Sequence, residues 1–124
     1  MLLNCLLVSV GGAIGSLLRF LVSIGIGSAN LSYPFATGIV NLLGSFLVGF
    51  ISAYAGPRGL LTEPARLLLF TGIMGGFTTF SAFALETVHL SREGLSLYVF
   101  LNITFHFVIC LGSAFVGFKL GTAI

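Results

Sequence analysis

The segment "GGFTTFSAF", residues 75–83, lies in the middle of a long apolar stretch, yet it is unlike a regular membrane-spanning helix. It places two adjacent glycines before two β-branched threonines, and both residue types lower helix propensity. A helix that only had to cross a bilayer would not need this sequence. We therefore expect the helix to be interrupted between Gly75 and Thr79 for a purpose other than spanning the membrane.

The composition defines the class of protein around this segment. Of the 124 residues, 57% are hydrophobic and 6% are charged, whereas soluble proteins average about 25% charged residues. Five basic and three acidic side chains cannot cover the surface of a water-soluble monomer. The length allows one domain at most. We predict a single all-α integral membrane domain over residues 1–124.

Four apolar segments have, or approach, the length of about 20 residues that a bilayer requires. These predicted transmembrane helices are Leu2 to Ile26, Phe35 to Ala55, Leu67 to Leu85 and Leu95 to Phe118. The predicted connectors are residues 27–34, 56–66 and 86–94. In the second connector, Pro57 and Pro64 are expected to act as helix breakers. No cleavable signal peptide is expected, because the first apolar segment is long enough to span and lacks a basic region before it.

The basic residues are almost evenly divided between the two predicted sides of the membrane. An even number of helices puts both termini on one side, together with Arg58, Arg66 and Lys119, and leaves Arg19 and Arg92 for the other side. Lys and Arg in short loops set membrane orientation. A chain this evenly balanced can insert in both orientations, although a chance balance in a small protein would look the same.

Polar residues recur at helical spacing in two of the predicted helices, so each set forms a stripe on one face. The second helix carries Thr37, Asn41, Ser45 and Ser52, and the fourth carries Asn102, His106, Cys110 and Ser113. One membrane-buried Asn often serves only as a hydrogen bond between helices. Hydroxyl groups in line with it favour a hydrated pathway instead. No carboxylate lies in the fourth helix, so we expect His106 to be a neutral member of its stripe.

Neutral donors without a full charge suit an anion that must bind weakly enough to leave again. Phe80 and Phe83, three residues apart after the interruption, fit the same purpose, because phenyl edges carry the positive end of the ring quadrupole. Arg19 in the first helix is either a snorkelling interfacial residue or an electropositive group at a pore entrance. Cys5 and Cys110 lack the clustering of a metal site and are interpreted as small core residues.

Three segments resemble the signature segments of the Fluc family, the small fluoride channels also called CrcB proteins. They are "GGAIGSLLR" (11–19), "TGIVNLLGSF" (37–46) and "GIMGGFTTFSAF" (72–83). The resemblance covers essentially the whole chain. It implies a fluoride-selective passive channel that exports fluoride across the bacterial inner membrane, built as an antiparallel dual-topology homodimer with two pores and a structural Na⁺ at the dimer interface. The implied partners are a second copy of the chain, fluoride and membrane lipid, and no nucleic acid.

The resemblance also implies roles for individual residues. The family's pore phenylalanines match Phe80 and Phe83, its second-helix asparagine matches Asn41, and its first-helix arginine and later glutamate match Arg19 and Glu86. Its third-helix hydroxyl residues match Thr79 and Ser81, and its Na⁺-binding carbonyl groups match Gly75 and Thr78. Apart from Glu86, and with His106 and Ser113 of the fourth-helix stripe added, these are the predicted site residues. The fourth helix departs from the family pattern, because Cys110 and Ala114 stand where hydroxyl residues are expected and Ser113 is one position away.

The sequence supports three other classes of function less well. A small dual-topology multidrug or cation exporter would share the four helices, but it needs an intramembrane carboxylate to couple protons to a cation. The acidic residues are Glu63, Glu86 and Glu93, which lie near predicted helix ends or in connectors. A non-conducting assembly subunit would leave the interruption and the polar stripes without a purpose. Catalysis has the least support, since no nucleophile stands beside a base and no ligand cluster is present.

Overall fold

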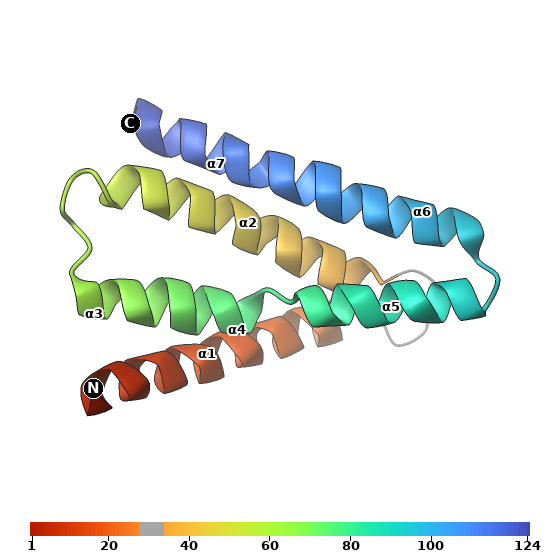
Figure 1. Ribbon diagram of the computed structural model, residues 1–124, viewed down its shortest axis with the longest axis horizontal. Coiled ribbons are helices and arrows are strands. Elements are labelled where there is room, and N and C mark those ends of the chain that lie inside the picture. The colour runs from red at the N-terminus through yellow and green to blue at the C-terminus, as the bar shows by residue number, and fades with distance from the viewer. Residues whose placement is uncertain (28–33) are drawn as a thin grey trace.

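The computed structural model describes residues 1–27 and 34–124, and all regular structure in these ranges is helical. Four long helical spans run alternately up and down, and the two termini lie at the same end of the molecule (Figure 1). Each span is long and apolar enough to cross a membrane. The predicted connector at 27–34 falls, for residues 28–33, outside the described residues. The four-helix prediction is confirmed.

The first two spans have the predicted bounds. Helix α1 covers Leu2–Ile26 and helix α2 covers Phe35–Ala55. The first helix ends at Gly27, which adopts the left-handed conformation with φ 64° that glycine tolerates best. Its N–H donates to the carbonyl of Ile24 and so closes the last turn.

The third span is longer than the sequence predicts, extending from Glu63 to Arg92 rather than from 67 to 85. It begins with α3 (Glu63–Arg66), where Thr62 accepts a hydrogen bond from the N–H of Ala65 and Pro64 occupies the first turn. The interpretation of Pro64 as a helix breaker was wrong, because proline is favoured at a helix start, where its missing N–H costs nothing. The helix continues as the π-helical segment η2 (Leu67–Met74).

The interruption is real but shorter than predicted. Segment α4 (Gly75–Phe77) is still helical, so the two glycines do not break the helix. Thr78 and Thr79 adopt extended conformations, with ψ 157° and 114°, and α5 (Phe80–Arg92) starts immediately after them. Gly76 is small for a packing reason instead, since a Cβ there would lie 2.5 Å from the carbonyl oxygen of Gly12 in α1.

Helix α5 also includes most of the predicted connector at 86–94. Its polar residues do not end the helix because they bond within or across the fold: Thr87 donates to the carbonyl of Phe83, and Thr37 donates to Glu86. The turn is confined to three residues, with Gly94 at φ 74°. The fourth span then comprises α6 (Ser96–Thr104), the π-helical segment η3 (Phe105–Cys110) and α7 (Leu111–Ala123). It extends five residues beyond the predicted end at Phe118.

Glycine allows the spans to approach each other closely. A Cβ at Gly11 would lie 2.5 Å from the carbonyl oxygen of Leu68, so α1 packs directly on the backbone of the third span. On the other side, a Cβ at Gly121 would lie 2.5 Å from the carbonyl oxygen of Phe50, and Gly117 is similarly placed against Phe46. Small residues at helix contacts are typical of membrane proteins, where van der Waals packing rather than the hydrophobic effect holds helices together.

Most large apolar side chains of the described residues point outward. The exposed residues of α1 alone include Leu6, Val10, Leu17 and Phe20. Such a surface would aggregate in water, whereas it matches the hydrocarbon of a bilayer. The protein is therefore a multi-pass membrane protein.

Candidate functional site

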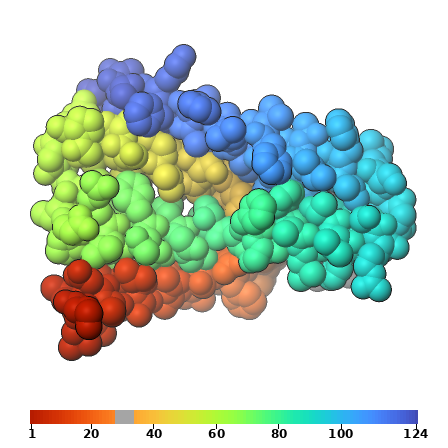
Figure 2. All heavy atoms as spheres, viewed as in Figure 1, coloured from red at the N-terminus to blue at the C-terminus, as the bar shows by residue number. Residues whose placement is uncertain are grey.

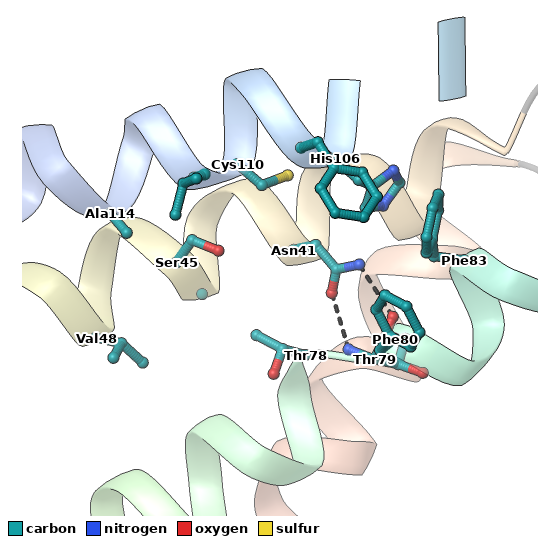
Figure 3. A pocket seen from close by; sticks show the side chains of 13 residues that line it. Asn41, Ser45, Val48, Thr78, Thr79, Phe80, Phe83, His106, Cys110 and Ala114 are labelled. Carbon is teal, nitrogen blue, oxygen red and sulfur yellow. Dashed lines mark hydrogen bonds between the residues drawn. The ribbon is translucent and has the colours of Figure 1, made fainter. Parts of the chain in front are cut away.

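Asn41 holds the interruption of the third span in place. Its Nδ2 donates to the carbonyl oxygen of Thr79 at 3.0 Å, and its Oδ1 accepts from the N–H of Thr79 at 2.8 Å (Figure 3). Both backbone groups of an extended residue in the membrane interior need partners, because each unsatisfied group there costs several kcal/mol. One amide side chain from α2 satisfies the pair, so the position of the interruption is set by a residue of the stripe that the sequence reveals.

Thr79 also caps the helix that follows the interruption. Its Oγ1 accepts from the N–H of Ala82 at 3.1 Å, which is the usual bond of an N-cap threonine. The hydroxyl of Ser81 lies 3.2 Å from the same oxygen. The N-terminus of α5 therefore has two hydroxyl groups close to it, and such a helix end favours negative charge.

Two backbone carbonyls lose their normal helical donors as a result. The N–H of Thr79, which would bond the carbonyl of Gly75 in a continuous helix, donates to Asn41 instead. The N–H of Ala82, which would bond the carbonyl of Thr78, donates to Thr79 Oγ1. These are the two carbonyls that the resemblance to the Fluc family selects for Na⁺. A Cβ at Gly75 would have only the carbonyl oxygen of Phe70 within 4 Å, at 3.6 Å, so this exposed position is open to an approaching neighbour.

A cavity of 520 Å³ lies beside the interruption. It is bordered by α2, by the start of α5 and by the fourth span and is open to the surface of the single chain, and the space-filling view is hollowed between α2 and the middle of the third span (Figure 2). Its walls are mainly apolar, with polar groups from Asn41, Ser45, Thr78, Thr79 and His106. Cys110 and Ala114 line the fourth-span wall (Figure 3).

Aromatic rings form one end of the cavity. Phe80 and Phe83 have ring centroids 5.3 Å apart, and their planes are tilted by 60° relative to each other. Phe83 is 5% exposed, whereas Phe80 is 72% exposed. The Phe83 ring also packs against the His106 imidazole, with ring centroids 4.3 Å apart and planes tilted by 33°. Phe83 is thus fixed in the wall, whereas Phe80 lies mostly exposed beside it.

The hydrogen bond of His106 decides what its ring offers to the cavity. Nδ1 lies 2.9 Å from the carbonyl oxygen of Asn102, so in the neutral ring Nδ1 carries the proton and donates it. Nε2 is then an acceptor, and it is buried without a hydrogen-bond partner among the described residues. A neutral His106 presents a lone pair and cannot donate a hydrogen bond to an anion through Nε2.

Of the eight predicted pore residues, five line this cavity and three do not. Those that line it are Asn41, Thr79, Phe80, Phe83 and His106. Ser81 is exposed beside Thr79. Ser113 donates to the carbonyl oxygen of Leu42 at 3.0 Å, which ties the fourth span to α2. Arg19 is half-buried on α1 and does not border the cavity.

The contact between Thr37 and Glu86 is a feature that the sequence pattern did not reveal. Glu86 was expected at a helix end or in a connector, but it lies within α5 and accepts a hydrogen bond from Thr37 of the α2 stripe. Its second oxygen is buried without a partner among the described residues. The signal that could have indicated the contact is the register of Thr37, one turn before Asn41 on the same face.

The fold and site define a class of protein: a small multi-pass membrane protein whose cavity lies beside an interrupted span. Its sequence matches the family described as CrcB-like protein, Camphor Resistance (CrcB), over residues 6–118. The chain belongs to this CrcB family.

Relatives share most of its length. A protein of Chlorobaculum tepidum named fluoride-specific ion channel FluC is 52% identical over 100 residues, which cover 81% of this chain and 79% of the relative. Proteins with the same name from Elusimicrobium minutum and Idiomarina loihiensis are each 40% identical, over 117 and 121 residues. These alignments cover 91% and 97% of this chain and 89% and 93% of the relatives.

Proposed function

We propose that this protein is a fluoride-selective passive ion channel that exports fluoride across the bacterial inner membrane. The observation that carries the proposal is the cavity beside the Thr78–Thr79 interruption, where a helix N-terminus, hydroxyl groups and phenyl rings converge without a fixed charge. Membership of a family with relatives named fluoride-specific ion channels supports the same function.

Along the proposed pathway, several lining residues each contribute a weak interaction. The second N–H of Asn41 Nδ2 is not used by Thr79 and is available to fluoride. The Thr79 hydroxyl and the edges of Phe80 and Phe83 add partial positive charge. Several modest interactions allow rapid entry and exit, which one strong site would prevent. Arg19, Ser81 and Ser113 remain proposed pore residues outside this cavity.

We further propose that two chains assemble as an antiparallel dual-topology homodimer with two pores. The nearly even division of the basic residues supports it: Arg58, Arg66 and Lys119 belong to the end that holds both termini, whereas Arg92 and Arg19, in the second half of α1, belong to the other half of the molecule (Figure 1). Cysteine introduced at position 58 or 92 is expected to react with an impermeant reagent from both sides of the native membrane. Labelling from one side alone would contradict dual topology.

The residues at the interruption fit a structural Na⁺ at the dimer interface. The carbonyls of Gly75 and Thr78 lack their usual helical donors, and no group of three or more metal-binding side chains exists among the described residues. One chain supplies two such carbonyls, so two chains would supply four. When bound, the ion would add positive charge near both pores. Replacing Na⁺ by a large organic cation is expected to lower dimer stability and fluoride flux; indifference of both would contradict the site.

The function is tested by ion efflux from liposomes that contain the purified protein. Fluoride is expected to leave rapidly down its gradient, while chloride is retained. A small multidrug or cation exporter is the second candidate, and it would instead move an organic cation against protons with no fluoride flux. Glu86 lies in the third span and is the residue such coupling would require. However, the Glu86 carboxylate accepts a hydrogen bond from Thr37 and is held in the contact with α2. This arrangement favours the channel function over proton-coupled exchange.

A further inference from the structure

Ser52 belongs to the polar stripe of α2, but it does not line the cavity beside the interruption. It borders a second cavity of 300 Å³, between α2 and the start of the third span, toward the end that holds both termini (Figure 1). The other polar residues of this second cavity are Glu63, Arg66 and Thr71. None of these four residues is part of the first cavity.

The two cavities share one wall residue, Val48. One face of α2 carries, at spacings of four, three and four residues, Asn41, Ser45, Val48 and Ser52. Figure 3 shows the first three of these side chains on the side of α2 that faces the third span. The third span also borders both cavities, the second with Thr71 and the first with Thr78. The two cavities therefore adjoin at Val48, between the same two spans.

Polar groups of the second cavity have no partner within the described chain. A hydroxyl group in a helix can bond the backbone carbonyl four residues before it, as those of Thr78 and Thr87 do here. The hydroxyls of Ser52 and Thr71 and the guanidinium of Arg66 form no hydrogen bond or ion pair with another described residue. A guanidinium presents five N–H donors and is always charged. These groups therefore suit a small anion.

Glu63 also borders the second cavity and opposes this attraction. It is the first residue of α3, whereas Arg66 lies one turn further into the span, by about 4.5 Å of helix rise. The positive charge is thus nearer to the first cavity than the negative charge is. Charges in a cleft act on ions without direct contact, so an anion that moves from the surface toward Val48 is drawn inward by Arg66.

We propose that the second cavity is the entrance of the fluoride pathway at the end that holds the termini, where Arg66, Ser52 and Thr71 attract fluoride before it passes Val48. This inference rests on the proposed function and names the residues that the anion meets first. Val48 is an apolar residue between two polar chambers, and an apolar constriction can control ion passage by excluding water. Beyond it, fluoride meets Ser45 and then Asn41 in the first cavity.

The role of charge at this entrance is tested by single-channel fluoride currents at two salt concentrations. In about 0.1 M fluoride salt, Arg66→Gln is expected to lower the current by about twofold or more, and Glu63→Gln is expected to raise it. In about 1 M salt both variants should match the wild-type protein, because the Debye length falls from about 10 Å to about 3 Å. Arg66→Lys keeps the charge and should keep the current at both concentrations.

Arg58→Gln is the matched control, because it removes the same charge from the same end of the molecule. The Arg58 guanidinium lies over the Tyr54 ring at 4.6 Å, donates to the Tyr54 carbonyl and borders neither cavity. Its loss should change the current less than the loss of Arg66 does. An unchanged current in Arg66→Gln at the lower salt concentration, or an equal effect of Arg58→Gln, would overturn the entrance. Absence of fluoride current in the wild-type protein would instead contradict the channel function.

A thiol introduced at position 52 tests the route independently of charge. The background is Cys5→Ser, which removes an exposed thiol. In this background, Ser52→Cys should react with a small methanethiosulfonate reagent, and the attached group should remove most of the fluoride efflux from liposomes. Thr71→Cys, in the opposite wall, should behave in the same way.

Two proteins serve as controls for this labelling. The Cys5→Ser protein and its Thr122→Cys variant, at an exposed position of α7, should keep their efflux after the same treatment. Mass spectrometry measures the extent of reaction. Absence of reaction at positions 52 and 71, or complete reaction there without loss of efflux, would show that fluoride does not pass through the second cavity.

Discussion

The third and fourth spans have similar lengths, 30 and 28 residues, but different internal structures. The third span is interrupted at Thr78–Thr79, where the side chains of Asn41 and Thr79 bond the N–H and carbonyl of Thr79 and the N–H of Ala82. The fourth span is helical from Ser96 to Ala123 and packs on α2 through Gly117 and Gly121. One span thus uses polar side chains to expose backbone at a cavity, and the other uses small residues for close contact. Changes to the first should affect transport, and changes to the second should affect stability.

The largest expected effects are on the rings after the interruption. Phe80→Ala and Phe83→Ala are each expected to reduce fluoride efflux by at least about tenfold, because a ring edge facing the anion is lost. The two variants should differ in stability. Phe83→Ala removes a buried ring and should lower the free energy of unfolding by about 3 kcal/mol, whereas Phe80→Ala removes an exposed ring and should leave the stability of the single chain unchanged.

Efflux and thermal unfolding in detergent check both parts of this prediction. Phe20→Ala, at an exposed site on α1, is the matched control for loss of a surface ring. Near-normal efflux in both Phe80→Ala and Phe83→Ala would mean that the rings only pack the fold.

Asn41→Leu tests how the interruption is held. The N–H and carbonyl of Thr79 would lose their partners, and each unsatisfied buried group costs about 1–3 kcal/mol. We expect lower thermal stability and a loss of fluoride efflux of about tenfold or more. Asn4→Leu, at an exposed position of α1, provides the control. Retention of both properties in Asn41→Leu would show that the extended residues do not depend on the amide.

Gly117→Ala tests the close contact of the fourth span with α2. Its Cβ would collide with the carbonyl oxygen of Phe46, so we expect a loss of about 1–3 kcal/mol in the free energy of unfolding. Gly112→Ala is the matched control in the same helix, because nothing lies within 4 Å of its Cβ. That change should stabilise the helix by about 1 kcal/mol or less. Equal unfolding temperatures for the two variants would contradict the packing account.

The smallest expected effect is that of Ser113→Ala. The hydroxyl bonds the carbonyl of Leu42, and an interhelical hydrogen bond in a membrane protein contributes about 0.6 kcal/mol. Efflux is expected to fall far less than in Asn41→Leu. A loss of efflux equal to that of Asn41→Leu would place Ser113 in the pathway and would weaken the contrast between the two spans.

Much of this fold could be predicted from the sequence because a bilayer requires apolar helices of a known minimum length. Apolar length gave four spans, and the bounds of α1 and α2 agree with the prediction. The spacing of Thr37, Asn41 and Ser45 correctly indicated one polar face, since Asn41 and Ser45 line the cavity and Thr37 bonds Glu86. Helix periodicity does not depend on knowing the partner helix, which is why this part succeeded.

The details that failed depend on contacts between helices. The glycines at 75 and 76 suggested a longer interruption, but only the two threonines are extended, because Asn41 bonds Thr79 alone. The polar segment at 86–94 was predicted to be a connector because its residues have no apolar pattern. In the structure most of it is helical, and Thr37 and Asn102 supply hydrogen-bond partners for Glu86 and Thr87. Ser113 matched the stripe by spacing, yet its hydroxyl bonds the backbone of α2. A single sequence does not show which polar groups of different helices form hydrogen bonds with each other.

Single-channel recording in planar bilayers tests most directly the claim that fluoride passes through a passive pore beside the interruption. With purified protein and fluoride on both sides, the account predicts discrete current steps that reverse at the fluoride equilibrium potential, and none when chloride replaces fluoride. In Phe80→Ala these steps should be lost. Fluoride movement without current steps, or only when driven by an opposing proton or cation gradient, would contradict it.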